Sequence, residues 1–542
     1  MKKITFPIGI DNFREMRIRQ DYYVDKSLFI RDFIEFNNKV SLITRPRRFG
    51  KTLNMTMLKE FFDITKDSGE IFKGLLIMDT PYARGMNTRP VVFLTFKNCR
   101  GDTVDRLRLS IIRALLSEYM KYVKIIGDND TYESFTIKSH FDKLKNKLAS
   151  MDELRTYLAD LIECVSFFYG TPPLLLIDEY DQPIISSYEH GFREEMTDFF
   201  SVFLGEALKG NENLGQALIT GIQRVVKESI FSQLNNILVF TVLDDYYAPY
   251  FGLTYDETKM LIEAAGLEMS EEMCRKYDGY FFGGISMYNP WSVLNYAFKK
   301  HLDNFWANTS SNLLIRRSIV QMDDLFKRDF NKLMENGEVE VSPKLETSFF
   351  ELQNAYTLWG LLINAGYLTV SKYTPGRSTM IVRIPNGEVN EEFVEIIAQI
   401  SNVPNTLLHI MIESLMDQNM VRFVQAYKDI VLSYTSFYDA KENAYHMLFL
   451  GMCISLAGRY RITSNIESGH GRSDIKMESL YLSHPHIIIE FKQGEDLDKL
   501  KYDALDQIES QQYYFGLKGE VLCLGVAHDK KRCEIAWRTV TK

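Results

Sequence analysis

The sequence is poor in cysteine and has no long apolar run. Its 542 residues include six cysteines, none of them spaced C-x-x-C, so we expect reduced thiols rather than a disulfide framework. The N-terminal stretch MKKITFPIGIDNF has two lysines but no apolar run of signal-peptide length. No stretch approaches the roughly 18 apolar residues that suggest a membrane span. We therefore expect a cytoplasmic protein without a membrane partner.

A surplus of basic charge is also absent. The formal net charge of −9 argues against capture of nucleic acid by the whole molecule, although it leaves room for a local basic groove. Low-complexity segments and clear internal repeats are missing too. The composition is ordinary for a globular protein, with 46% hydrophobic and 25% charged residues, and the length predicts roughly three or four domains.

The first informative stretch is the motif RPRRFGKT at residues 45–52. An apolar run precedes it and a helical pattern follows it, which is the strand–turn–helix context of a phosphate-binding loop. The backbone around Gly50 would meet the phosphates of ATP, Lys51 would reach the β- and γ-phosphates, and Thr52 would ligate Mg²⁺. Arg45 stands where the general motif G-x-x-x-x-G-K-[ST] has its first glycine. A basic surface turn that opens a helix is therefore the alternative.

A second stretch, PPLLLIDEYD at residues 172–181, would supply the acids of a nucleotide site. Its aliphatic residues run straight into carboxylates, as in a strand buried on both faces of a parallel sheet. Carboxylates at the C-terminal end of such a strand lie at the crevice where α/β sheets bind ligands. Asp178 would hold Mg²⁺ through water, and Glu179 would orient or activate the attacking water. The alternative is a strand that ends in solvated acids.

The next predicted strand, QALITG at residues 216–221, contributes a third element. It ends near Thr220, where ATPases of the AAA type keep a polar sensor close to the γ-phosphate. Arg224 follows. It could stabilise charge in the transition state, report on the nucleotide state, or be a surface arginine.

The middle of the chain carries less chemistry. Residues 225–325 look mostly helical, and their aromatic-rich turns suggest a packed lid. From residue 326 to 404, a helix capped at Gly366 leads into a hairpin, which is winged-helix-like. This connector could touch DNA or pack between domains, and we favour packing because it is not strongly basic. We expect domains at residues 1–228, 229–325, 326–404 and 405–542.

The C-terminal part contains a second constellation of polar residues. Asp474 begins a strand, and an apolar strand ends in Glu490-x-Lys492. Glu490 and Lys492 share one face of their strand, and Asp474 on the adjoining strand can meet them there. Two converging carboxylates suit Mg²⁺ or Mn²⁺, which polarises a phosphoryl group. Lys492 would position the water or stabilise the charge that develops on the phosphate, and Glu442 could supply a further ligand or hold a metal-bound water.

The alternative for this constellation is an exposed hairpin with solvated charges. The three isoleucines at residues 487–489 argue against it, because carboxylates beside a buried strand need a compensating partner. Gln507 and Tyr514, on a predicted amphipathic helix, could reach the edge of the site or the DNA backbone. A zinc site is not favoured, because the nearby histidines lack ligand spacing: His470, His484 and His486.

Over nearly its whole length the chain resembles a family of bacterial proteins in which an AAA-ATPase-like domain precedes a PD-(D/E)xK nuclease-superfamily domain. The motifs that carry the resemblance are RPRRFGKT (45–52), LIDEYD (176–181), TGIQR (220–224), KESIFS (227–232), YDGY (277–280), NPWSV (289–293), NTS (308–310), GRSD (471–474) and IEFK (489–492). The RPRRFGK form looks like this family's own phosphate loop. Because only glycine adopts positive φ freely, Arg45 would make the loop wrap the phosphates less completely, and Arg47 and Arg48 would compensate with charge.

We therefore expect two α/β domains with different activities. A P-loop NTPase-like parallel-sheet domain would bind and hydrolyse ATP, and a restriction-endonuclease-like domain would cut nucleic acid, with DNA favoured and defence against foreign DNA as a role. Nucleotide state would gate the nuclease by moving the lid or by changing a homo-oligomer. Two alternatives stay open: a non-catalytic switch or scaffold that only binds nucleic acid or a partner, and an ATPase with a degenerate nuclease domain.

Overall fold

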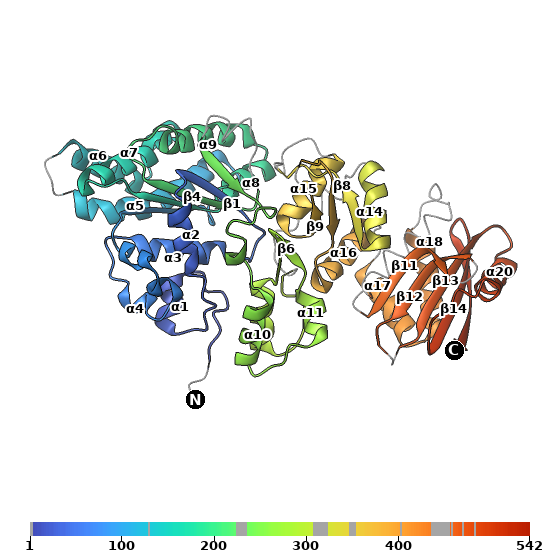
Figure 1. Ribbon diagram of the computed structural model, residues 1–542. Helices are drawn as coiled ribbons and strands as arrows, with labels where there is room; N and C mark the ends of the chain where they lie inside the picture. The colour runs from blue at the N-terminus through green and yellow to red at the C-terminus, as the bar shows by residue number, and fades with distance from the viewer. Residues whose placement is uncertain are drawn as a thin grey trace. The chain divides into compact units, whose positions relative to one another are not determined.

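The computed structural model describes residues 4–127, 131–223, 236–306, 324–345, 354–374, 376–400, 404–434, 456, 459–468, 471–481 and 484–542. The chain divides into two compact units, whose elements are labelled in Figure 1. Unit 1 comprises Met1–Met269, Gly279–His301 and Ser342–Ser378. Unit 2 comprises Ser270–Asp278, Leu302–Val341 and Thr379–Lys542.

Unit 1 is built on a five-stranded sheet with the strand order β2-β3-β4-β1-β5. All of its pairings are parallel. Strands β1, β3 and β4 are buried along their whole length, as their short apolar runs predict. The predicted P-loop NTPase-like sheet is thereby confirmed. The strands are β1 (Val40–Thr44), β2 (Val91–Thr95), β3 (Leu174–Asp178), β4 (Gln216–Gly221) and β5 (Ile237–Phe240).

Helices lie on both sides of this sheet (Figure 1). The strands share one hydrophobic core with α5 (Val104–Ile126), α6 (Tyr132–Lys145), α7 (Met151–Tyr169) and α9 (Arg193–Leu208). The other side carries α1 (Phe13–Arg19), α2 (Leu28–Phe36), α3 (Lys51–Phe62) and α4 (Gly69–Phe72). Shorter elements are η1 (Leu76–Asp79), η2 (Pro81–Gly85) and α8 (Gln182–Glu189).

The part of unit 1 that follows β4 is less helical than the sequence suggests. It contains β5, η3 (Ala248–Tyr250), α10 (Tyr255–Ala264), the hairpin β6 (Tyr280–Phe282) to β7 (Ile285–Met287), and α12 (Pro290–Lys299). A domain boundary at residue 228 would place β5 in the lid, whereas β5 pairs with β1 in the sheet. Four residues with only partial burial give too weak a pattern to identify such an edge strand.

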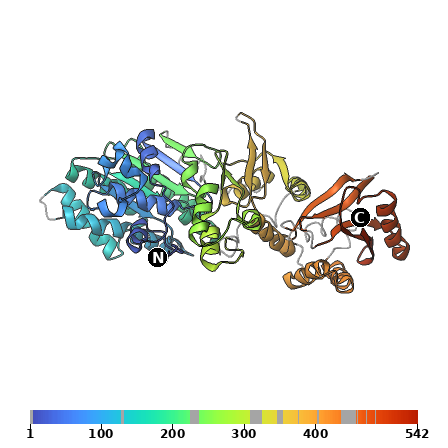
Figure 2. The same cartoon turned by 60° about the horizontal axis from the view of Figure 1, so that its bottom comes forward.

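Unit 2 contains a mixed five-stranded sheet with the order β11-β12-β13-β14-β15. Strands β13 and β14 are parallel, and the other neighbours are antiparallel. Helix α20 (Leu497–Ser510) connects the parallel pair and packs against it; Figure 2 gives a second view. The contact is close, because a Cβ added at Gly525 would lie 2.2 Å from the Lys501 carbonyl oxygen. The strands are β11 (Tyr460–Ser468), β12 (Gly471–Ser479), β13 (His486–Gln493), β14 (Glu520–Asp529) and β15 (Arg532–Thr541).

The predicted connector at residues 326–404 has the expected elements. Helix α15 (Ala355–Ala365) ends at Gly366 with a φ of 87°, and β9 (Thr369–Tyr373) and β10 (Met380–Arg383) follow. Strand β10 pairs antiparallel with β8 (Glu338–Val341). Two of the boundaries between the units fall within this connector, after Val341 and after Ser378. The other helices of unit 2 are α11 (Glu271–Tyr277), α14 (Asp324–Asn336), α16 (Gly387–Ile400), α17 (Asn405–Met416) and α18 (Met420–Tyr434).

Two expectations from composition can be compared with the described residues. The five cysteines among them are free thiols: Cys99, Cys164, Cys274, Cys523 and Cys533. None of the helices in the described ranges is both long enough and apolar enough to cross a membrane.

Candidate nucleotide and nuclease sites

The phosphate loop connects β1 to α3 in the predicted order. Gly50 caps α3 with a φ of 84°, a left-handed conformation that glycine adopts without strain. Lys51 is only 6% exposed, and its ammonium group donates hydrogen bonds to the carbonyl oxygens of Arg45 and Pro46, each at 2.8 Å. The loop therefore folds around Lys51 at the N-terminus of a twelve-residue helix, as a phosphate site requires.

Asp178, at the end of β3, links helix α3 to strand β4. Its Oδ2 accepts a hydrogen bond of 2.8 Å from the Thr52 hydroxyl, and its Oδ1 accepts one of 2.7 Å from the Thr220 hydroxyl. Burial raises the pKa of the Asp178 carboxyl, and the neighbouring Glu179 adds to this effect. The structure thus brings together the hydroxyl, the acid and the sensor that the sequence predicted. A threonine hydroxyl beside a carboxylate is a donor set that fits Mg²⁺.

Lys51 is a buried cation close to three carboxylates. Burial lowers the pKa of the Lys51 ammonium to about 8, while Glu179, Asp178 and Asp181 oppose this shift. Glu179 has a φ of 52°, a conformation that costs energy for a residue with a side chain. Such strained residues cluster at functional sites, which is consistent with the predicted role of Glu179.

Arg45 occupies the position of the motif's first glycine, but its backbone does not adopt the positive φ that would favour glycine. Positive φ in the loop falls at Arg48 (72°) and Gly50 (84°), not at Arg45. The Arg45 side chain is fully buried and donates to the carbonyl oxygens of Thr44 (2.8 Å) and Phe240 (3.1 Å). Arg45 therefore anchors the loop to β5, and a less complete wrapping of the phosphates stays a prediction.

Replacing Arg45 with glycine, which restores the general motif, is expected to destabilise the protein. The change removes a fully buried side chain, so the free energy of unfolding should fall by about 3 kcal/mol, the order found when large buried side chains are truncated. Urea or thermal unfolding measures the effect. Arg45→Met keeps most of the buried stem and should lose less. An Arg45→Gly protein as stable as the wild type would contradict the anchoring role.

Asp181 is a site residue that sequence reasoning missed. Its Oδ2 accepts hydrogen bonds from the backbone N–H groups of Ile222 (2.9 Å) and Gln223 (3.3 Å), just after β4. Burial raises its pKa to about 6. Tyr180 contacts the same segment after β4, because its hydroxyl donates a hydrogen bond to the Gln223 carbonyl oxygen at 2.8 Å. The presence of a third acid in the motif LIDEYD could have pointed to Asp181. Its hydrogen bonds tie the segment after β3 to the segment after β4.

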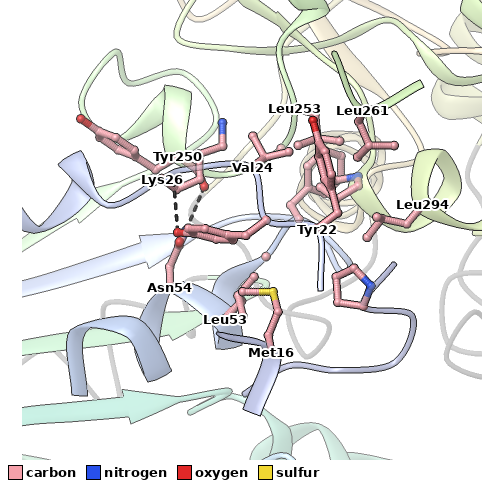
Figure 3. Close-up of a pocket in the computed structure, with 16 residues that line it drawn as sticks. Met16, Tyr22, Val24, Lys26, Leu53, Asn54, Tyr250, Leu253, Leu261 and Leu294 are labelled. Atoms are coloured by element: carbon pink, nitrogen blue, oxygen red, sulfur yellow. Dashed lines mark hydrogen bonds between the residues drawn. The ribbon is translucent and has the colours of Figure 1, made fainter. Parts of the chain in front are cut away.

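A mostly apolar pocket lies beside the phosphate loop (Figure 3). Its empty volume, which includes space open to solvent, is about 520 Å³. Phe49 and Gly50 belong to the phosphate loop and also line the pocket. The remaining walls come from the N-terminal segment (Pro7, Met16, Tyr22, Tyr23, Val24, Lys26), from α3 (Leu53, Asn54), and from the region after β5 (Tyr250, Gly252, Leu253, Leu261, Pro290, Leu294).

The predicted arginines differ in what the structure places around them. Burial lowers the pKa of Arg47, whose nearest opposite charges are Asp181 and Glu179. The Arg48 guanidinium lies over the ring of Trp291, 3.9 Å from its centroid. Arg224 lies outside the described residues, so its role stays a prediction.

The nuclease candidates meet on two neighbouring strands of unit 2. The register pairs Ile475 of β12 with Ile489 of β13, so Asp474 and Glu490 come next to each other. Asp474 Oδ2 accepts a 2.7 Å hydrogen bond from the Phe491 N–H, and the Asp474 N–H lies 3.4 Å from Glu490 Oε2. Lys492 Nζ lies 3.5 Å from Glu490 Oε1. The three predicted residues therefore form one cluster.

Helix α20 contributes a fourth side chain to this cluster. Gln507 donates a hydrogen bond to Glu490 and lies 3.0 Å from the hydroxyl of Tyr513. The tyrosine that reaches the site is therefore Tyr513 rather than Tyr514, whose ring instead contacts the Lys542 ammonium at 4.3 Å. Helix α20 ends at Ser510, and the turn that follows it shifts which tyrosine points inward.

The electrostatics of the cluster fit a hard divalent cation. Burial raises the pKa of Glu490 to about 8, with a further contribution from Asp474, while Lys492 lowers it. Burial also raises the pKa of Asp474. A buried carboxylate held beside a half-buried one at this cost suits a bound cation. Groups of three or more acidic, histidine or cysteine side chains with metal-binding geometry are absent from the described residues, and Glu442 lies outside them.

The fold and the two clusters define the class of the protein. A parallel sheet with a phosphate loop, Asp178 and Thr220 defines a P-loop NTPase-like domain, and the mixed sheet with Asp474 and Glu490 defines a nuclease-like domain. In agreement, residues 7–231 match the family model for a predicted AAA-ATPase, and residues 440–538 match the PD-(D/E)XK nuclease superfamily. The chain therefore carries an AAA-ATPase-like domain followed by a PD-(D/E)XK nuclease-superfamily domain.

A curated relative is similar to the chain over most of the length of both proteins. It is 26% identical over 406 residues, which cover 73% of this chain and 70% of the relative. The relative is described as an uncharacterized protein in the vnfD 5′ region of Azotobacter chroococcum mcd 1, so its description assigns no activity.

Proposed function

We propose that unit 1 binds and hydrolyses ATP with Mg²⁺. The observation that carries this proposal is the Thr52–Asp178–Thr220 hydrogen-bond chain beside a buried Lys51. Mg²⁺ bound there would neutralise charge on the phosphates. Thr52 and Asp178 would hold it, Lys51 would bind the phosphates, and Glu179 would orient the attacking water. Arg47 and Arg224 would contribute positive charge.

The pocket beside the loop suits the base of the nucleotide. Its apolar walls would bury a flat ring, and its continuity with Phe49 and Gly50 would let one ligand reach both pocket and loop. Asn54 links α3 to the far wall, because its Nδ2 donates to the Tyr250 carbonyl oxygen at 2.8 Å (Figure 3). Isothermal titration with ATP and with ADP tests the binding.

We propose that unit 2 is a metal-dependent nuclease that cuts DNA. Asp474 and Glu490 would hold Mg²⁺ or Mn²⁺, which would act as a Lewis acid on a phosphodiester. Lys492 would stabilise the negative charge that develops on the phosphate. Gln507 would hold the Glu490 carboxylate in place, and Glu442 would add a ligand. Cleavage of single-stranded and double-stranded DNA, and of RNA, with either metal tests this activity.

The two activities on one chain motivate a regulatory role, in which the nucleotide state controls cleavage. Movement of the lid or a change in a homo-oligomer would carry this control. A cytoplasmic nuclease under such control is suited to attack foreign DNA, and we propose defence as its role. If the cleavage rate and DNA affinity were indifferent to ATP, ADP and Lys51→Ala, the control would be disproved.

Metal binding at the nuclease site is expected to depend on pH. The pKa of Glu490 is about 8 without metal, so a cation must displace a proton at neutral pH. Apparent affinity for Mg²⁺ or Mn²⁺ should rise between pH 6 and about pH 8 and then level off. Calorimetry in buffers of different ionisation enthalpy should detect up to about one proton released per cation at pH 7.

The same shift predicts how stability varies with pH. A carboxyl whose folded pKa is raised binds more protons folded than unfolded, so without metal its contribution to stability falls as pH rises from about 4.5 to about 8. Added Mg²⁺ should therefore raise the melting temperature more at pH 8 than at pH 6. Glu490→Gln should abolish this difference. Metal affinity that stays constant from pH 6 to pH 9 would contradict the assignment.

A further inference from the structure

Aromatic rings from the region after β5 contact two residues of the phosphate loop. The Arg48 guanidinium lies 3.9 Å from the centroid of the Trp291 ring. The neighbouring Phe49 packs its ring edge-to-face on Tyr280 (4.8 Å between centroids) and Phe282 (5.0 Å). The loop is therefore in contact with both the β6–β7 hairpin and the start of α12.

Arg48 belongs to the phosphate loop and lies two residues before Gly50. Its φ of 72° is unfavourable for a residue with a side chain, so neighbouring contacts must hold it. Its side chain is exposed, and the charges that act most strongly on it belong to Arg47 and Glu179. Arg48 therefore adds an exposed positive charge to the phosphate loop.

Trp291 sits on a helix that also lines the base pocket. Asn289 caps α12, and its side-chain oxygen accepts hydrogen bonds from the N–H groups of Trp291 (3.0 Å) and Ser292 (3.2 Å). Pro290 and Leu294 of the same helix line the pocket. One helix thus contacts both the pocket and Arg48.

We propose that Trp291 is a positioning residue of the nucleotide site, whose indole face holds the Arg48 guanidinium where it meets the phosphates. This proposal rests on the nucleotide binding proposed above. Helix α12 then sets the geometry of both ends of the site, with Leu294 at the base and Trp291 at the phosphate end. A cation stacked on tryptophan is the strongest pairing of this kind, and it restricts a long side chain that would otherwise sample many rotamers.

Comparing ATP with inorganic tripolyphosphate separates the two ends of the site, because tripolyphosphate has no base. The affinity of each ligand would be measured by calorimetry for the wild type, Trp291→Ala, Trp291→Phe and Leu294→Ala. Trp291→Ala should weaken both ligands about tenfold, the scale of a lost charge contact. Trp291→Phe, which keeps an aromatic face, should bind within about twofold of the wild type. Leu294→Ala should weaken ATP and leave tripolyphosphate unchanged.

If Trp291→Ala weakened ATP alone, as Leu294→Ala does, Trp291 would only pack the helix and the proposal would be wrong. Arg48→Gln, at an exposed loop position, should weaken both ligands as Trp291→Ala does, and it decides the matter if Trp291→Ala fails to fold. Unchanged tripolyphosphate affinity in Arg48→Gln would overturn the proposal. A wild type that binds neither ligand would overturn the nucleotide function as well, whereas failure of the variants alone leaves that function intact.

Discussion

Lys51→Ala is expected to lower the affinity for ATP by about a hundredfold or more. The ammonium group is buried at the start of α3, where it donates to two loop carbonyl oxygens and lies near carboxylates. A phosphate would replace these carbonyls as a charged acceptor, and hydrogen bonds to charged groups contribute about 1.5–3 kcal/mol each. Calorimetry or a fluorescent nucleotide measures the loss.

A matched variant controls for the loss of a lysine as such. Lys73 is exposed and pairs with Glu70, so Lys73→Ala should bind ATP like the wild type. The melting temperature of Lys51→Ala shows whether the loop still folds. ATP binding that survives Lys51→Ala unchanged in a folded protein would contradict the assignment of the phosphate loop.

Glu490→Gln is expected to lower metal-dependent cleavage on the order of a thousandfold or more. The substitution keeps the size of the side chain but removes one of the two charges that would hold the cation and, through it, the reacting phosphate. Since Glu490 also accepts from Gln507 and lies beside Lys492, its loss should disturb the whole cluster. Initial rates of DNA cleavage in Mg²⁺ and in Mn²⁺ measure the effect.

The control for this variant lies on the strand that bears Asp474. Glu478 of β12 pairs with Lys476 at 3.2 Å, outside the cluster, so Glu478→Gln should cleave at about the wild-type rate. Equal loss in both variants would point to general damage to the sheet. Cleavage by Glu490→Gln at the wild-type rate would place the nuclease site elsewhere.

The parts of the fold that could be predicted are those whose signals are local. Strands β1, β3 and β4 are continuous apolar runs, and β13 is three isoleucines followed by an acid, so burial on both faces is written in adjacent residues. Asp178 and Thr220 could then be placed together, because parallel strands end at a common edge. Asp474 and Glu490 could be placed together in the same way, because they lie on two neighbouring strands.

The parts that could not be predicted depend on distant partners. Arg45 is explained by Phe240, 195 residues away in sequence, which accepts its hydrogen bond. A role for Trp291 is indicated by its contact with Arg48, which is far away in the sequence. Tyr513 rather than Tyr514 reaches Gln507, because the chain leaves α20 through a turn that periodicity does not specify. In each case a tertiary contact decided what the local pattern left open.

The measurement that tests the account most directly is cleavage of DNA in Mg²⁺, with and without ATP, by the wild type, Lys51→Ala and Glu490→Ala. The account predicts cleavage by the wild type that requires Mg²⁺ or Mn²⁺ and changes in rate when ATP is added. Lys51→Ala should cleave without responding to ATP, and Glu490→Ala should not cleave. Failure of the wild type to cut DNA or RNA with either metal, or cleavage that persists in Glu490→Ala, would contradict the central claim.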